Sequence, residues 1–155
     1  MATTPSLRVR PKGKTGKVHS ITPNSARWTY VGFALHKLAS GEAVGAETGS
    51  DEVCLVLVSG KAKISVDGKD LGELGQRMTP FEGEPYSVYV PQGHDWEVVA
   101  TTALELAVCS APGGGGFEPR VIPPGTNPQI TRGRAPTRAT SPISCPRPIR
   151  PSRCW

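Results

Sequence analysis

The sequence contains few of the residues from which metal sites and membrane segments are built. Only three histidines and four cysteines occur, and no two cysteines form a Cys-x-x-Cys pair, so a zinc site has no support. The longest apolar runs are far too short to span a bilayer. The N-terminal segment is polar and basic and lacks the apolar stretch of a signal peptide. We therefore expect a cytoplasmic protein with no membrane partner.

Acidic residues are absent from Ala135–Trp155, which instead holds four arginines and is rich in proline. The formal net charge of the whole chain is +5. Without those 4 arginines, 14 of the 18 basic residues remain against 13 acidic ones, so Met1–Arg134 is nearly neutral. An arginine-rich arm that binds nucleic acid is one alternative. Because the excess charge lies outside the neutral body, we expect no nucleic-acid partner.

The body also lacks any segment with the periodicity of a three-turn helix. It contains short runs rich in β-branched and aromatic residues, separated by Gly, Pro and Asp, which predict strands. These runs are Trp28–Leu38, Val53–Val58, Ala62–Val66, Lys69–Leu71, Tyr86–Val90, Trp96–Ala100 and Leu104–Cys109. Several short strands joined by Gly/Pro turns indicate an all-β fold, a β-sandwich or jelly roll, in a single domain.

One predicted strand, Val53–Val58, is an almost continuous apolar run, which indicates a strand covered on both faces. Cys54 lies in this run and Cys109 in another apolar strand, so we expect both to be buried free thiols. Ser59-Gly60 marks a turn after the run, and Asp67-Gly68 predicts a hairpin.

Chemistry in a small β-barrel often depends on a cupin metal site. That site has two histidines one residue apart, a glutamate shortly after, and a third histidine one hairpin later. Gly41, Gly60 and Pro91-Gln92-Gly93 supply the turns of such a motif. Its ligands are missing, because Glu47-Thr48-Gly49 or its neighbours occupy the place of the histidine pair, none of them is His, and the third histidine would be expected near Trp96. We therefore assign no catalytic, cofactor-binding or metal-ligating residue to this chain.

Two polar pairs are weaker candidates for chemistry. His94-Asp95 is either an orienting pair and proton relay or an exposed turn histidine with its neighbour. Asp51-Glu52 holds either a carboxyl of raised pKa at Glu52 or a solvated pair at the start of a strand. His19 and His36 are isolated, and we expect His36 to face solvent, opposite Leu35.

Several stretches together resemble one enzyme family. They are Gly16-Lys17-Val18 with Ser20–Pro23, Trp28–Phe33, Glu52–Ala62, Gly72–Met78 with Phe81-Glu82-Gly83, Tyr89-Val90-Pro91, and Leu104–Pro112. This set resembles the 5-deoxyglucuronate isomerases of bacterial myo-inositol breakdown, which are relatives of the uronate ketol-isomerases of pectin breakdown. The resemblance runs from about Leu7 to Arg134.

The resemblance implies a bicupin of roughly double this length, whose first half is a cupin-like jelly-roll β-sandwich. Such an enzyme converts 5-deoxyglucuronate into 2-deoxy-5-keto-gluconate by moving a proton between adjacent carbons through an enediol-like species. A divalent metal, Zn or Mn, is held by a His-x-His…Glu…His set in the second cupin of the family. Nothing in this chain matches that set, so we expect the chain to need no cofactor and to be inactive alone.

We divide the chain into four segments. Residues 1–16 form a loose lead-in, and residues 17–111 form the cupin-like domain. Residues 112–134 form a Gly/Pro-rich connector, in which Gly113–Gly116 is a linker because it lacks the Lys-Ser/Thr pair and the helix of a phosphate loop. Residues 135–155, with Cys145 and Cys154, form a disordered tail.

The composition of the tail is typical of GC-rich DNA read out of frame. One permitted back-translation of the tail, read one base earlier, begins Gly-Thr-Asn-Thr-Arg-Tyr-Val-Thr-Asn-Ile-Leu-Pro-Glu, which resembles the family's continuation. We therefore interpret the tail as the product of a one-base shift near Gly133–Arg134.

Two functions remain open at this level. The chain is an isomerase by descent that lacks the metal site, or it is a non-catalytic cupin-like module that binds a small sugar acid or packs against a partner domain. Either way, half of a bicupin leaves its inter-cupin surface exposed, which predicts self-association.

Overall fold

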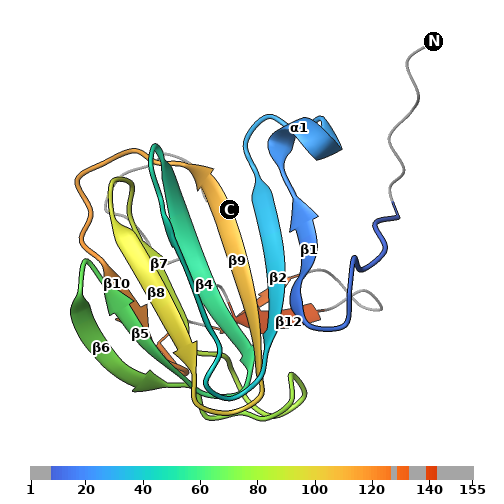
Figure 1. Cartoon of the computed structure of the whole chain (residues 1–155), viewed down its shortest axis with the longest axis vertical. Helices are drawn as coiled ribbons and strands as arrows, with labels where there is room; N and C mark the ends of the chain where they lie inside the picture. Colours follow the sequence, from blue (N-terminus) through green and yellow to red (C-terminus); the bar gives the residue numbers. More distant parts are fainter. Residues whose placement is uncertain (1–7, 127–128, 133–138, 143–155) are drawn as a thin grey trace.

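Two antiparallel β-sheets face each other around one hydrophobic core (Figure 1). The computed structural model describes residues 8–126, 129–132 and 139–142. The larger sheet has the strand order β1 (Gly16–Ile21), β2 (Gly32–Leu38), β9 (Leu104–Pro112), β4 (Asp51–Ser59), β7 (Ser87–Val90) and β10 (Arg120–Ile122). The smaller sheet has the order β3 (Ala43–Glu47), β8 (Asp95–Ala100), β5 (Ala62–Val66) and β6 (Lys69–Leu74). The all-β prediction is confirmed.

A short helix and a two-stranded ribbon lie outside this sandwich. Helix α1 (Pro23–Ala26) has four residues and joins β1 to β2. Strands β11 (Gln129–Arg132) and β12 (Ala139–Pro142) pair with each other in an antiparallel ribbon. No helix in the described ranges is long and apolar enough to cross a membrane.

Alternation along the central strands builds the core. In β4, Val53, Leu55 and Leu57 are buried, whereas Cys54 and the other residues between them are half-buried. The core cluster also includes Val88, Val90 and Leu106 of the larger sheet, and Ile64, Val66, Trp96 and Val98 of the smaller sheet. Full burial of such a side chain is worth about 1.5–3 kcal/mol. The run Val53–Val58 is thus covered fully on its inner face only, because each sheet of a sandwich meets the other with one face.

The turn residues of the smaller sheet adopt the backbone conformations that the sequence predicts. Asp67 and Gly68 have positive φ angles of 50° and 73°, and they connect the paired residues Val66 and Lys69. Two consecutive positive φ angles are the signature of the tight hairpin turn that Asp-Gly favours. Gly60 has a φ of 93°, and a Cβ there would collide with the carbonyl of Ala103. The predicted turn and hairpin are both confirmed.

Three strand assignments differ from the sequence prediction. Strands β1 and β3, both at sheet edges, were not among the predicted runs. The β3 residues are mostly small and exposed, so no apolar alternation marks them. The run Trp28–Leu38 becomes a strand only from Gly32, because α1 ends in a left-handed residue, Arg27 (φ 57°), and the chain has yet to reach the sheet.

Strands also occur in the segments predicted as a connector and a tail. β10 pairs with β7 and extends the larger sheet, and Val121 packs against the core. The pairing of β11 with β12 places residues 139–142 of the predicted disordered tail in a ladder. Composition carries no information about a pairing partner, and a ladder satisfies the backbone groups of both strands. Residues 133–138 and 143–155, which include Cys145 and Cys154, lie outside the described residues.

Candidate functional site

A pocket of about 220 Å³ opens between the two sheets. It is lined by β1, β2, β4 and β9 of the larger sheet, by β3 and β8 of the smaller sheet, and by the turn between β3 and β4. The exposed side chains of Lys17 and Glu47 mark its rim. Its polar lining consists of Lys17, His36, Glu47, Thr48, Asp51 and Ser110, and Trp96 closes one side. The pocket is therefore polar at its rim and partly apolar at its base.

His36 lies in this pocket and is only 5% exposed. The expectation that His36 faces solvent is wrong. It pairs in register with Leu106, a core residue, whereas Leu35 is on the opposite, outer face of the larger sheet. Both faces of this strand carry apolar residues, so alternation alone could not show which face is inside, and it placed Leu35 inside instead of His36.

The surroundings of the His36 ring favour its neutral form over its charged form. Burial lowers the pKa of His36, and the positive charge of Lys17 lowers it further. Lys17 is the residue opposite His36 in the β1–β2 pairing. A neutral imidazole offers one donor and one acceptor nitrogen, and it can therefore bind a hydroxyl or a carboxylate without carrying charge.

The positions that a cupin motif gives to metal ligands do line the pocket. Glu47 and Thr48 occupy the place of the histidine pair, and Trp96 stands near that of the third histidine. Glu47 is exposed, and Trp96, which is 6% exposed, fills its position with an indole. In the described part of the chain, no three His, Cys, Asp or Glu side chains are grouped so that they could hold a metal ion. The residues at these positions do not fit the metal that the resemblance implies for the family.

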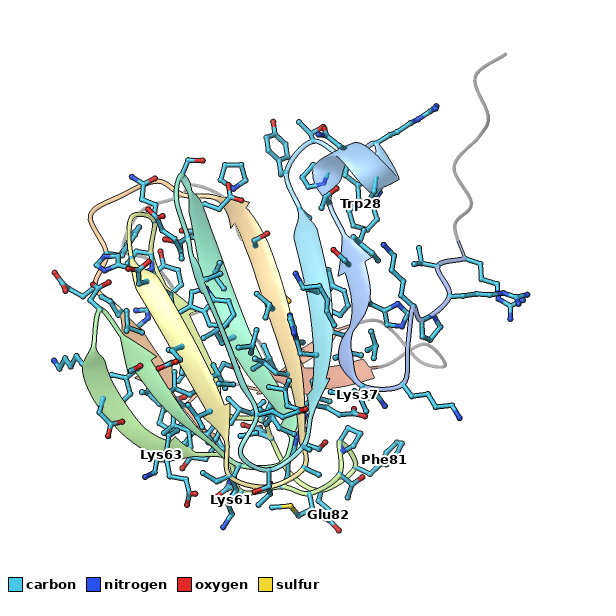
Figure 2. All side chains as sticks on the ribbon, in the orientation of Figure 1. Trp28, Lys37, Lys61, Lys63, Phe81 and Glu82 are labelled. Atoms are coloured by element: carbon cyan, nitrogen blue, oxygen red, sulfur yellow. The ribbon has the colours of Figure 1, made fainter. Side chains whose placement is uncertain are left out.

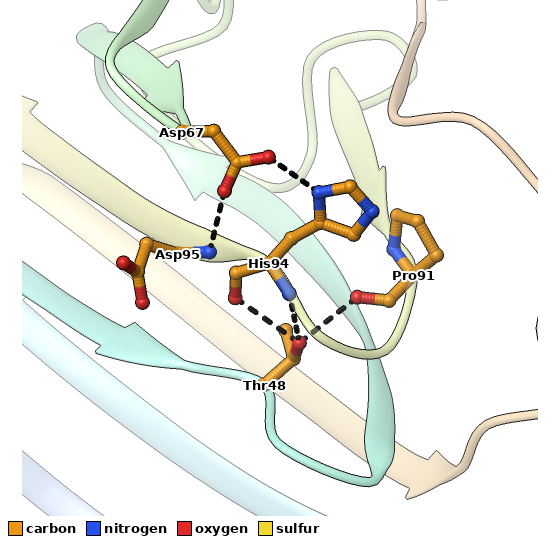
Figure 3. A network of polar contacts seen from close by, with 5 residues as sticks. All are labelled: Thr48, Asp67, Pro91, His94 and Asp95. Carbon is orange, nitrogen blue, oxygen red and sulfur yellow. Dashed lines mark hydrogen bonds and ion pairs between the residues drawn. The ribbon is translucent and has the colours of Figure 1, made fainter.

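The predicted pair His94-Asp95 does not form through its side chains. The Nδ1 atom of His94 lies 2.5 Å from Oδ2 of Asp67, on the β5–β6 turn (Figure 3). The other Asp67 oxygen accepts a hydrogen bond of 2.9 Å from the backbone N–H of Asp95. The bond to His94 is the main cause of the lowered pKa of Asp67, followed by the bond from Asp95. His94 is not among the pocket residues, so this network joins two turns.

Thr48, beside the pocket, forms hydrogen bonds with the β7–β8 turn that carries His94. It is 7% exposed, and its hydroxyl lies 2.9 Å from the carbonyl oxygen of Pro91 and accepts a 3.0 Å hydrogen bond from the backbone N–H of His94 (Figure 3). The backbone N–H of Thr48 donates to the carbonyl of His94. The β3–β4 and β7–β8 turns are thereby held together beside the pocket.

The pair Asp51-Glu52 is split between the two faces of β4. Asp51 lines the pocket, whereas Glu52 accepts a 2.8 Å hydrogen bond from the hydroxyl of Tyr89. Burial raises the pKa of Tyr89, and the bond to Glu52 raises it further. Glu52 therefore bonds to a neighbouring strand outside the pocket.

The remaining candidates lie away from the pocket. Cys54 and Cys109 are register partners on β4 and β9, half-buried, and no disulfide links them. Burial raises the pKa of the Cys109 thiol. His19 pairs with Leu35 in the β1–β2 register, and Gly113–Gly116 forms a loop after β9.

Sequence reasoning missed Lys17, Ser110 and Asp67. Lys17 and Ser110 lie at opposite ends of the domain sequence and line the same pocket only because β1, β2 and β9 are neighbours in the sheet. Asp67 was identified only as a turn residue, and its sequence context did not indicate that its carboxylate would also bond to His94. For these residues, the sequence alone held no signal of the contacts that they make.

The two facing antiparallel sheets, with a pocket lined at the cupin ligand positions, define a cupin-like β-sandwich. A solved structure of Bacillus subtilis oxalate decarboxylase shares this fold with a TM-score of 0.51 and 12% identity over 71% of this chain and 29% of that one. The sequence model of the KduI/IolB family matches residues 7–147. The chain therefore belongs to the KduI/IolB family. The matched range extends past Arg134, into the segment interpreted as a tail.

Relatives with higher sequence identity than the oxalate decarboxylase include proteins named 5-deoxy-glucuronate isomerases. The chain is 49% identical over 110 residues to a 5-deoxy-glucuronate isomerase of Geobacillus thermodenitrificans, covering 70% of this chain and 40% of that protein. It is 32% identical over 96 residues to the 5-deoxy-glucuronate isomerase of Bacillus subtilis (strain 168). A crystal structure of an IolB-like protein from Salmonella typhimurium matches with a TM-score of 0.79 and 39% identity over 84% of this chain and 50% of that one. The chain thus spans half or less of the length of these relatives.

Proposed function

We propose that this domain is part of an enzyme that isomerises 5-deoxyglucuronate to 2-deoxy-5-keto-gluconate in the cytoplasmic breakdown of myo-inositol. The observation that carries the proposal is the 49% identity to a 5-deoxy-glucuronate isomerase over 110 residues. The reaction moves a proton from the carbon beside the aldehyde to the aldehyde carbon, and the hydroxyl proton on that neighbouring carbon moves to the aldehyde oxygen, with no net gain or loss of atoms. A base that carries that proton is its central requirement.

In this proposal the catalytic residues lie in the part of the relatives that this chain does not match. An exposed Glu47 and the Trp96 indole at the cupin ligand positions support that assignment. The divalent metal, Zn or Mn, and the sugar acid substrate are assigned to that same part. The domain described above then serves the enzyme through its fold, by packing against the second cupin.

A pair of activity assays tests this proposal. The purified 155-residue chain, incubated with 5-deoxyglucuronate with and without added Mn²⁺ or Zn²⁺, is expected to give no ketose product. A chimera in which residues 8–122 replace the matching segment of the Geobacillus thermodenitrificans relative is expected to keep its activity. Turnover by the chain alone would show that a complete catalytic site lies within it. A folded but inactive chimera would argue against the proposal that this domain has the same role as the matching segment of the Geobacillus relative.

The one-base shift near Gly133–Arg134 remains a prediction about the gene. The family match through residue 147 weighs against an abrupt end of the resemblance at Arg134. Resequencing of the gene tests it: a downstream frame that encodes a second cupin supports the shift, and the absence of such a frame in all readings refutes it.

The second candidate function is a non-catalytic module that binds a small sugar acid. The polar pocket between the sheets favours it, because residues of this chain are sufficient to form the pocket. A rise in melting temperature with a sugar acid, without turnover, is the result that this function predicts.

A further inference from the structure

The side chain of His36 is buried without a protein partner. It is 5% exposed, and among the described residues it makes no hydrogen bond or ion pair. The only fully buried side-chain polar atom in that part of the chain without a partner is Oγ1 of Thr101, so the ring nitrogens of His36 are open to the pocket. Buried polar groups are normally hydrogen-bonded, and a group left open in a cavity indicates an occupant.

Lys17 supplies a positive charge beside that ring. It stands opposite His36 in the β1–β2 pairing, and it lines the same pocket. The ion pairs within the described residues are Lys37 with Glu105 and His94 with Asp67, so the Lys17 ammonium has no carboxylate partner there. An ammonium at the rim of a polar pocket attracts an anionic group.

The remaining lining suits hydroxyl groups and a carbon skeleton. Glu47 and Asp51 line the pocket, and neither side chain forms an ion pair within the described ranges. Free carboxylates accept hydrogen bonds from hydroxyls, and the Ser110 hydroxyl both donates and accepts. Trp96 adds an aromatic wall, on which the C–H groups of a sugar pack.

The volume limits the size of the occupant. The pocket has a volume of about 220 Å³. This is below the ~300–1,000 Å³ of pockets for drug-sized ligands. A monosaccharide derivative suits this space, whereas a nucleotide or a peptide does not.

We propose that this pocket is a binding site for a small polyhydroxylated monocarboxylate, with Lys17 and His36 on its carboxylate and Glu47, Asp51 and Ser110 on its hydroxyls. The inference rests on the second candidate function, to which it adds residues and a ligand class. It places a ligand site in this domain, separate from the catalytic site that the proposed enzyme has elsewhere.

Titration of the 155-residue chain with D-glucuronate tests the site. Calorimetry is expected to give saturable binding with a Kd of about 1 mM or tighter. D-glucose, which has the same ring without the carboxylate, is expected to bind roughly 10-fold or more weakly. Lys17→Met removes the charge and keeps the apolar stem, and it is expected to weaken glucuronate binding by roughly 10- to 100-fold.

A matched control and a direct probe complete the experiment. Lys63→Gln removes a lysine that is exposed on β5 outside the pocket (Figure 2), and it is expected to leave the affinity unchanged. The ¹⁵N resonances of the His36 ring are expected to shift on addition of glucuronate to the unmodified chain. The proposal would be overturned by the absence of glucuronate binding at about 10 mM, by a Lys17→Met variant that binds glucuronate as tightly as the unsubstituted chain, or by His36 resonances that do not shift. Tighter binding of L-serine than of glucuronate would do so too, because it would assign the pocket to a zwitterion.

The failure of this site and the failure of the proposed isomerase are distinguishable. Binding is measured on this chain, whereas turnover is measured on the chimera with the Geobacillus relative. An active chimera with no glucuronate binding by the chain refutes only the pocket inference, and binding with an inactive chimera refutes only the isomerase.

Discussion

Replacement of Thr48 by valine tests whether its hydroxyl holds the pocket rim together. The substitution keeps the shape of the side chain and removes the hydroxyl, which meets the Pro91 carbonyl at 2.9 Å and the His94 N–H at 3.0 Å. Thr48 and Pro91 are buried, so little water is available to replace these bonds. The loss therefore includes the desolvation of groups left without partners, and not only the net value of the bonds.

The magnitude follows from those two bonds. A hydrogen bond contributes about 0.5–1.5 kcal/mol net, and an orphaned buried group costs about 1–3 kcal/mol. Because His94 is only partly buried, we expect Thr48→Val to lower the free energy of unfolding by about 2–3 kcal/mol. With a urea m-value of about 1–3 kcal/mol/M, the unfolding midpoint falls by about 0.7–3 M.

Two variants control this measurement. Ser40→Ala removes a hydroxyl that also joins two distant loops, through a 2.9 Å bond to the Thr101 carbonyl, but Ser40 is exposed. It is expected to cost less than about 1 kcal/mol. Thr48→Ser keeps the hydroxyl and is expected to retain most of the stability. A Thr48→Val midpoint equal to that of Ser40→Ala would refute the reasoning.

Three further predictions concern charge, a thiol and the surface. The pKa of Asp67 is lowered in the folded protein, so its contribution to stability is present above the ordinary value of 3.8 and is lost as pH falls through the folded value. Measurements of unfolding at decreasing pH are expected to show this loss of stability. The Asp67→Asn variant is expected to lack it. The raised pKa of Cys109 predicts slow alkylation by iodoacetamide at pH 8, with a rate that rises steeply with pH. Phe81 is 94% exposed and Trp28 is 51% exposed, at opposite ends of the molecule (Figure 2), so light scattering is expected to detect association that increases with protein concentration.

Each of these three has a contradicting result. If the acid unfolding curve of Asp67→Asn matches that of the unsubstituted protein, the bond between Asp67 and His94 does not cause the loss of stability in acid. Alkylation of Cys109 as fast as in urea would show an accessible thiolate. A monodisperse monomer at all concentrations would contradict the prediction that exposed apolar surface drives self-association.

Most of the sandwich was predictable because its signals are local. Apolar β-branched runs marked seven of the ten strands of the two main sheets, and Asp67-Gly68 marked its hairpin. The edge strands β1, β3 and β10 were missed, because an edge strand is partly solvated and needs no continuous apolar run. Pairing with β2, β8 and β7 makes them strands, and that information lies elsewhere in the chain.

The candidate site was less predictable than the fold. The positions Glu47, Thr48 and Trp96 were found through motif spacing, which is a local property. His36 was placed on the wrong face, because alternation defines two faces without saying which of them another sheet covers. Asp67 could not be assigned to His94, since 27 residues separate them in sequence.

The sequence by itself determined the strand-rich character of the chain, its tight turns and the amino acids at the cupin ligand positions, because backbone propensity and motif spacing are written locally. Only the tertiary structure decided that His36 points inward beside Lys17, and that both share one pocket with Glu47, Asp51 and Ser110. The physical reason is that a sandwich buries one face of each strand. That choice depends on the facing sheet, and it places residues from six strands and the turn after β3 around a single cavity.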